Sequence, residues 1–243
     1  MRRIILLFIM TSGCFASYSQ EVDLLRLGYD VGALQSHQKG MAVSPDGKII
    51  VFLYEDKTVK VFDVSIGRFT KKFKASYENL FDVQLASNQQ LILVENKTVH
   101  VIDLKMESET TQYPLEEEAT KTAFSGKHNL IAVGQKGGYV AVIDLKAQKQ
   151  IFSTQYKKHH VSALAFHPDG KRILVGVMSF LKSNNPLKQY DLVTGKEISE
   201  SPGGTFTMAA YDETGDHLII SGLNFLGTKS IVEVRSEERR VGK

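Results

Sequence analysis

Short apolar runs alternate with turn-forming residues along most of the chain. In the first such stretch, the apolar run 49–53 is followed by a turn and by a second run that ends in an acidic residue, Asp63. Pro45, Asp46 and Gly47 precede the first run. Because Pro presets the backbone φ angle and Gly tolerates a positive one, this triplet predicts a tight turn. Short strands at regular spacing, separated by turn signals, favour an all-β propeller, sandwich or barrel.

The run that ends in an acidic residue recurs five times, and its period selects among these folds. Successive acidic residues are 40, 41, 47 and 42 positions apart. A period of about 40–45 residues is that of a four-stranded propeller blade. We therefore predict an all-β fold, a β-propeller of four-stranded antiparallel blades, with about five blades present and the ring incomplete. The acidic residues are Asp63, Asp103, Asp144, Asp191 and Glu233.

Each repeat is expected to begin with two strands joined by a tight turn. The first strands are predicted at 41–43, 81–85, 122–124, 161–166 and 207–211. The second strands are rich in β-branched residues, which favour a pleated conformation. They are predicted at 49–53, 91–94, 130–133, 173–177 and 218–220.

Two segments resemble the WD-repeat family. Residues 56–63 read DKTVKVFD and resemble the family's DxTVKVWD segment, with Phe62 in the Trp position. Residues 160–170 resemble its HxxxVxxVxFSPDG entry segment, and the resemblance implies that His160 is structural. The VIDL segment at 142–145, together with a PDGK turn, is equally similar to bacterial surface-protein propellers of the YVTN-like type.

The hydrogen-bond network that this resemblance implies is eroded here, although the resemblance covers nearly all of residues 37–234. The family joins a buried His, Ser, Asp and Trp within a blade. We expect the blades of this chain to rely on β-branched packing instead. At the position of Asp56, the later repeats carry Asn96, Gly137, Asn184 and Leu226.

The recurring acidic residues are expected to cap turns. A catalytic carboxylate occurs once, in a special environment, whereas these residues occur once per blade at one structural position. The residues that we assign to the structural repeat are Asp56, Asp63, Asp103, Asp144, Asp191 and His160.

The sequence shows no motif of enzyme chemistry. HExxH, CxxC and GxSxG motifs do not occur in it, so neither a zinc site nor a nucleophilic serine is indicated. Four other histidines are scattered without metal-ligand spacing. We therefore predict no catalytic residue, no cofactor and no metal site. The scattered histidines are His100, His128, His167 and His217.

Two repeats carry insertions that suggest a surface for a partner. From the turn glycine to the acidic residue, the first repeat spans 16 residues, the fourth 21 and the fifth 18. Insertions in repeat proteins often map to the binding face, and aromatic side chains suit a protein interface. The candidate partner-binding residues are Phe180, Leu181, Phe225 and Leu226. The open alternative is that these side chains pack back onto neighbouring blades.

The two ends of the chain are expected to lie outside the propeller, which is assigned to residues 20–234. Residues 1–19 have a basic start, an apolar stretch and a small polar end, as a signal peptide does. The apolar stretch is shorter than the ~20 residues of a membrane span. A lipid anchor on Cys14 is the alternative to simple cleavage. Residues 235–243, RSEERRVGK, resemble a translated sequencing adapter, which would make the chain a truncated fragment.

The charge of the predicted propeller differs from that of the whole chain, which is +3. The predicted tail has four basic and two acidic residues and the signal segment has two arginines, so residues 20–234 carry −1. Nucleic-acid binding needs a clustered positive surface and gains no support from this balance.

These features together predict an exported, periplasmic or extracellular propeller that acts as a non-catalytic scaffold. We expect a protein partner, no nucleic-acid partner and no membrane span. The resemblance to bacterial propellers leaves an alternative function, that of a propeller enzyme of the lactonase or dehydrogenase kind. A further alternative is an accessory propeller of a catalytic domain, such as a caspase-like peptidase, encoded beyond residue 234.

Overall fold

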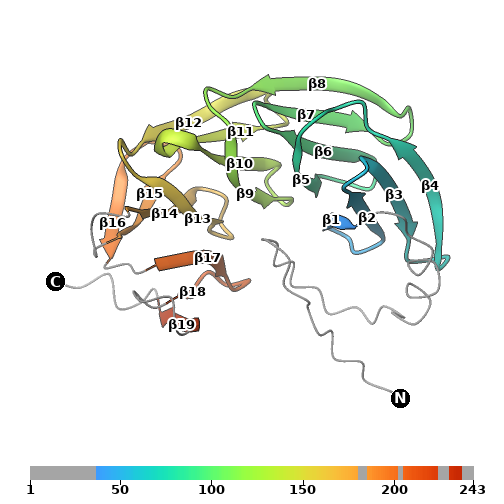
Figure 1. The fold of residues 1–243 in the computed structure, drawn as a ribbon. Coiled ribbons are helices and arrows are strands. Elements are labelled where there is room, and N and C mark those ends of the chain that lie inside the picture. The colour runs from blue at the N-terminus through green and yellow to red at the C-terminus, as the bar shows by residue number, and fades with distance from the viewer. Residues whose placement is uncertain (1–36, 180–184, 202–204, 224–229, 237–243) are drawn as a thin grey trace, which may run out of the picture. The chain divides into compact units, whose positions relative to one another are not determined.

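The protein is described by a computed structural model that covers residues 37–179, 185–201, 205–223 and 230–236 (Figure 1). In these residues the chain forms antiparallel β-strands and a short 3-10 turn at Lys136–Gly138, which confirms the predicted all-β fold. No helix among them has the length and apolar character needed to cross a membrane. The predicted signal segment lies outside the described residues.

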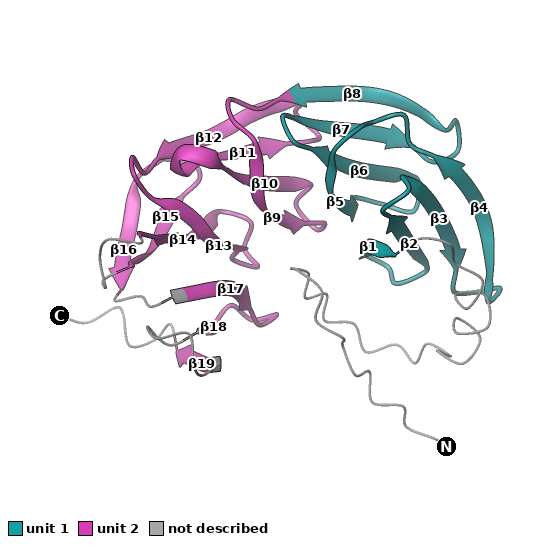
Figure 2. Ribbon diagram, viewed as in Figure 1, with its two compact units in different colours: residues 1–113 teal, residues 114–243 magenta. Residues whose placement is uncertain are grey.

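The chain divides into two compact units, residues 1–113 and 114–243 (Figure 2). The first contains two four-stranded sheets, and the second contains two four-stranded sheets and one three-stranded sheet. In every sheet each strand pairs with the next strand along the chain. An up-and-down meander of four strands is the arrangement of a propeller blade.

The strand bounds follow the predicted repeat, and all five predicted second strands are present. In the first unit the strands are β1 (Gln38–Val43), β2 (Ile49–Tyr54), β3 (Thr58–Asp63), β4 (Arg68–Lys74), β5 (Leu80–Leu85), β6 (Gln90–Glu95), β7 (Thr98–Asp103) and β8 (Ser108–Pro114). In the second unit they are β9 (Ala119–Ser125), β10 (Leu130–Gln135), β11 (Tyr139–Asp144), β12 (Lys149–Gln155), β13 (His160–Phe166), β14 (Arg172–Met178), β15 (Leu187–Asp191), β16 (Glu197–Ser201), β17 (Thr205–Tyr211), β18 (His217–Leu223) and β19 (Ser230–Ser236).

In the first and third sheets the second strand is the most deeply buried. All six residues of β10 are buried, and so are five of the six residues of β2. A strand covered on both faces has no polar face to present, which explains its nearly continuous apolar sequence. The fourth strand differs, because exposed and partly buried residues alternate along β4.

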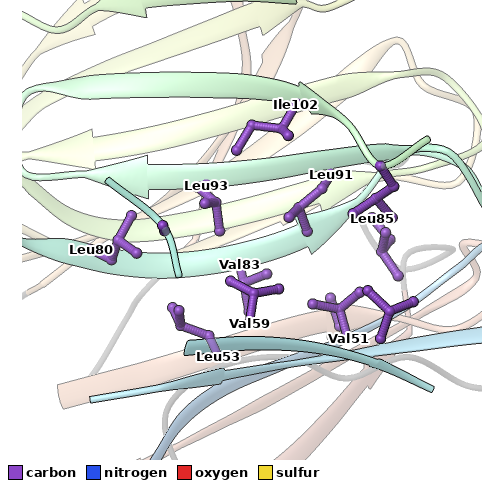
Figure 3. Packing of buried hydrophobic residues seen from close by; sticks show 13 residues of the cluster. Val51, Leu53, Val59, Leu80, Val83, Leu85, Leu91, Leu93 and Ile102 are labelled. Atoms are coloured by element: carbon purple, nitrogen blue, oxygen red, sulfur yellow. The ribbon is translucent and has the colours of Figure 1, made fainter. Parts of the chain in front are cut away.

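The core of the first unit lies between its two sheets. Val51 and Leu53 of β2 pack in one cluster with Val83 of β5 and with Leu91 and Leu93 of β6 (Figure 3). Burying a Val or Leu side chain stabilises the folded state by about 1.5–3 kcal/mol relative to leaving it exposed. Packing between sheets therefore supplies much of the stability of this unit.

The second unit has a core on each side of its middle sheet. On one side, Val142 of β11 packs in a cluster with Val161 and Val175 of the middle sheet. On the other side, Leu174 of β14 packs with Phe206 of β17. The middle sheet, β13 to β16, is thus covered on both faces.

The last described strand runs beyond the predicted end of the propeller at residue 234. β19 includes Arg235, whose guanidinium forms an ion pair with Glu233 at 3.0 Å and lies 5.5 Å from the ring centre of Phe206. The rest of the predicted tail lies outside the described residues.

Candidate functional site

The four candidate partner-binding residues, Phe180, Leu181, Phe225 and Leu226, lie outside the described residues. They belong to the β14–β15 and β18–β19 connections. Each connection joins the second strand of a sheet to its third.

The base of the β14–β15 connection is closed by a buried amide. The Asn185 side-chain oxygen accepts a hydrogen bond of 2.8 Å from the Ser179 backbone N–H, and Asn185 is buried. The Val177 N–H donates to the Pro186 carbonyl at 3.2 Å. Because a buried amide with its hydrogen bond satisfied resists displacement, these contacts hold the base of the connection in place.

The recurring aspartates cap the turn between the third and fourth strands. The Asp144 carboxylate accepts hydrogen bonds of 2.9 and 2.8 Å from the backbone N–H groups of Lys146 and Ala147. Asp63, Asp103 and Asp191 accept from the corresponding two amides of their own turns. A carboxylate that binds its own turn amides forms an Asx-type turn, so these residues organise the backbone.

Each of these turns also has a residue with positive φ, four positions after the aspartate. It is Gly67 at 66° and Gly195 at 71°, but Glu107 at 54° and Gln148 at 52°. Glycine adopts this conformation without the steric cost that a Cβ atom brings. In the other two turns, Glu107 and Gln148 adopt the same left-handed conformation, and their backbone is therefore strained.

Asp56 and His160, also assigned to the structural repeat, have different surroundings. Asp56 caps the β2–β3 turn, where it accepts hydrogen bonds from the backbone N–H and the hydroxyl of Thr58 at 3.0 and 2.9 Å. His160 opens β13 and is exposed, unlike the buried histidine that the family resemblance implies.

A buried cluster around His100 is a feature that the sequence interpretation missed. The His100 ring is buried, with Nδ1 2.6 Å from the Glu109 carboxylate and Nε2 3.2 Å from the Glu95 carboxylate. Tyr77 stacks on the ring at 3.9 Å between centroids, and its hydroxyl donates to Glu109 at 2.7 Å. A histidine scattered in sequence is thus held between two carboxylates from the neighbouring strands.

The electrostatics of this cluster favour an ionised Glu95 carboxylate and a protonated Tyr77 phenol. Burial alone raises the pKa of Glu95, but hydrogen bonds from the Glu78 amide and from His100 outweigh it and hold that pKa below its usual value. Burial, followed by the hydrogen bond to Glu109, raises the pKa of Tyr77. The phenol therefore stays a hydrogen-bond donor at neutral pH.

A second network occupies the corresponding part of the fourth repeat. The hydroxyl of Tyr156, from the linker before β13, donates to that of Tyr190 at 2.6 Å. The Glu197 carboxylate accepts hydrogen bonds from Tyr190 at 3.4 Å and from Lys188 at 2.8 Å. The hydrogen bond to Glu197 is the main cause of a raised pKa at Lys188.

These two networks correct the expectation that β-branched packing alone holds the blades. In each, a tyrosine from the linker before a sheet contacts an aromatic residue of the third strand, and that residue contacts an acidic residue of the fourth. The available signal was the recurrence of a tyrosine at Tyr77, Tyr113 and Tyr156, 36 and 43 residues apart, before three successive sheets.

Two further histidines contact the first turn of the next sheet. His128 Nε2 lies 3.0 Å from the Pro168 carbonyl, and a Cβ atom at Gly170 would lie 2.3 Å from the His128 ring. A Cβ atom at Gly215 would likewise lie 2.3 Å from His167 Nε2. Both glycines also have positive φ, at 69° and 82°. Glycine is therefore favoured at these positions because it adopts this φ without strain and because it has no Cβ atom to clash with the histidine ring.

The polar side chains of these clusters form hydrogen bonds with groups of the protein itself. Among the residues that the structure describes, no group of three or more His, Cys, Asp or Glu side chains is arranged to hold a metal ion. A buried polar group whose hydrogen bonds are satisfied within the fold stabilises that fold. We therefore interpret the His100, Tyr156 and His128 contacts as structural.

Several large apolar side chains are exposed on the described part of the chain. Met106 and Val193 are 72% and 79% exposed in their turns between third and fourth strands, and Ile66 is half-exposed in the corresponding turn. On β19, Val232 and Val234 are 69% and 61% exposed. Single exposed apolar residues are common, but those on β19 are grouped two residues apart.

Comparison with known proteins gives a match in sequence and a match in structure. Residues 122–212 match the family described as anaphase-promoting complex subunit 4 WD40 domain. Hydrazine synthase of Kuenenia stuttgartiensis is similar in structure, with a TM-score of 0.70 and 13% sequence identity, over 94% of this chain and 68% of that chain. A search of curated protein sequences finds no significant match.

The matched segment lies in the second unit, from β9 to the residue after β17. At 13% identity, the likeness to hydrazine synthase concerns the fold alone, which is propeller-like. Residues 122–212 are therefore similar to a WD40-type repeat domain, and the chain has an all-β fold of the β-propeller kind.

Proposed function

We propose that this protein is a non-catalytic β-propeller scaffold that binds a protein partner. The observation that carries the proposal is the WD40-type repeat over residues 122–212, because domains of this type mediate protein interactions. The apolar side chains exposed on β19, Val232 and Val234, support it, since contiguous exposed apolar surface marks interaction sites. The likeness to hydrazine synthase adds no reaction to the proposal.

The partner-binding surface is proposed to include the insertions of the fourth and fifth repeats. Phe180 and Phe225 are the aromatic residues of these insertions. Aromatic side chains at the centre of an interface contribute a large share of its binding energy. The closed base at Ser179 and Asn185 supports the proposal, because a fixed base lowers the entropic cost of ordering a connection on binding.

Affinity capture followed by mass spectrometry tests this function. The tagged wild-type protein should enrich a defined protein partner, and the F180A/F225A variant should lose it. Val193→Ala is the matched control, because it removes an exposed apolar side chain from a turn between third and fourth strands. If the wild type enriches no protein but turns over a small molecule, the scaffold proposal is wrong.

We further propose that the protein is exported to the periplasm or the cell exterior. The support is the basic start, short apolar stretch and small polar end of residues 1–19. N-terminal sequencing of the protein from the periplasm of a Gram-negative host should find Gln20 as the first residue, or Ser17 if cleavage follows Ala16. An R2E/R3E variant should be retained in the cytoplasm. Recovery of intact Met1 in the cytoplasm for the wild type contradicts export.

A further inference from the structure

The outer strand of the first sheet has an unusual charge. β4 contains Arg68, Lys71, Lys72 and Lys74 and no acidic residue. The fourth strands of the other complete sheets differ, because β8 carries one Glu, β12 carries one Lys and β16 carries two Glu. The position in the blade therefore does not require a basic strand, and the charge of β4 is particular to this one.

The basic side chains of β4 are accessible. Arg68, Lys72 and Lys74 are exposed, while Phe69 and Phe73 between them are partly buried. Phe73 packs with the cluster between the two sheets, whereas Phe69, beyond a register irregularity in β4, packs with a cluster on the other face of its sheet. The apolar residues attach the strand to the sheet, and the charged residues are left at its surface.

A third lysine adds to the same face. Lys60 of β3 lies directly opposite Lys72, and Thr58 lies opposite Lys74, so Lys60, Lys72 and Lys74 share one face of the sheet. The Lys60 ammonium lies 5.2 Å from the ring centre of Phe69, where the π electrons of the ring partly offset its charge. Like charges directly opposite in a sheet are destabilising, so the pair of Lys60 and Lys72 has a cost to the isolated protein.

Little within the described chain offsets that cost. Lys71 forms an ion pair with Glu107 at 2.7 Å. Lys72 and Lys74 form no ion pair with any residue in the part of the chain that the structure describes. Protection of a sheet edge by lysine is a common reason for such residues, but β8 and β16 are edge strands of the same kind without it.

We propose that the basic face of β4, formed by Lys60, Lys72 and Lys74, binds an acidic segment of the protein partner. The proposal rests on the scaffold function and names the chemistry of one surface. In an extended segment, alternate side chains lie about 6.6 Å apart, which is the spacing of Lys72 and Lys74 on β4. Asp or Glu at alternate positions would pair with both lysines, and β4 lies at the end of its sheet, beside which an extended segment can lie.

Fluorescence anisotropy with a labelled peptide of alternating Glu and Ser residues tests the proposal on the full chain. The wild type should bind this peptide, and higher salt should weaken the binding because the charges are exposed. The K72E/K74E variant should bind the peptide at least about tenfold more weakly than the wild type does. The matched control is S153E/Q155E, which adds two negative charges at the corresponding exposed positions of β12 and should bind as the wild type does. Thermal unfolding verifies that both variants are folded.

Each other outcome overturns the proposal. Absence of peptide binding, or equal binding by the wild type and K72E/K74E, shows that the basic face of β4 does not bind acidic segments. Tighter binding of duplex DNA or of phosphatidylserine vesicles than of the peptide shows that the face serves another anion. If affinity capture retains the partner in K72E/K74E and loses it in F180A/F225A, the scaffold function stands and this inference fails. If wild-type capture fails, the scaffold function itself is wrong.

Discussion

Tyr77 stacks on His100 with 3.9 Å between ring centres, and both side chains contact the same Glu109 carboxylate. Tyr77 lies in the linker that precedes the second sheet, whereas His100 lies on the third strand of that sheet. The contact therefore holds the linker between β4 and β5 against the sheet that follows it. Tyr156 and Tyr190 make the corresponding contact two repeats later, so the protein uses this device more than once.

Replacing His100 by alanine should destabilise the first unit. The variant leaves a cavity beneath Tyr77 and removes a hydrogen-bond partner from both Glu95 and Glu109, at a cost of about 1–3 kcal/mol in the free energy of unfolding. Urea denaturation measures this difference. The control is His217→Ala, in which the lost histidine pairs with Asp212 at an exposed position and the expected change is about 0.5 kcal/mol. Equal losses in the two variants would show that the His100 cluster contributes little.

Asp212 should remain ionised well below the usual pH range of a carboxylate. The hydrogen bond from the His217 side chain, assisted by the His217 and Gly215 amides, lowers the pKa of Asp212 to about 2. The pKa in the folded state is then below the value of about 3.9 in the unfolded chain. The stabilisation is present above pH about 3.9 and is lost as pH falls towards the folded-state pKa. NMR titration of the Asp212 carboxyl carbon should give the low midpoint, and His217→Ala should raise it. A midpoint near 4 in the wild type would be inconsistent with this pairing.

Alanine at Gly170 or Gly215 should destabilise the second unit more than alanine at Gly195. All three glycines have positive φ, so each variant has a backbone cost of about 1–2 kcal/mol. Only at Gly170 and Gly215 would the new methyl group meet a histidine of the preceding sheet, whereas nothing lies within 4 Å at Gly195. The steric contact should add about 1–3 kcal/mol. Chemical denaturation of the three variants measures the difference, and three equal losses would refute the contact between sheets.

Glycine at Gln148 should stabilise the protein. Gln148 has φ of 52° at the turn position where Gly67 and Gly195 stand in other repeats. Relief of the left-handed strain should exceed the entropy that glycine adds to the unfolded chain, for a net gain of up to about 1 kcal/mol. Gln150→Gly, two residues further on in β12, is the control and should destabilise because glycine weakens a strand. The melting temperatures of the two variants should therefore move in opposite directions.

Sequence reasoning predicted the features that depend on local pattern. The predicted strand 49–53 is β2, and the aspartates cap their turns through amides two and three residues away. Such features are set by the period of a strand and by the preferences of turn residues, both of which are visible in a short window. They suffice to predict the all-β blade repeat.

The polar networks could not be predicted in the same way. His100 and Glu109 are nine residues apart on neighbouring strands, and Tyr77 is farther away still, in a linker. Their contact depends on the register of β7 and β8 and on the path of the linker, neither of which the sequence pattern determines. The basic face of β4 was also overlooked, because the net charge of the propeller segment averages Lys60, Lys72 and Lys74 with acidic residues that lie elsewhere.

The most direct test of the proposed function is the affinity of the captured partner for purified variants, measured by isothermal titration. The wild type and Val193→Ala should bind equally, and F180A/F225A should bind more weakly by about 2 kcal/mol or more, the scale on which aromatic interface residues contribute. Equal affinity of all three proteins would contradict the proposed surface. Failure of the wild type to bind any protein would contradict the scaffold function as a whole.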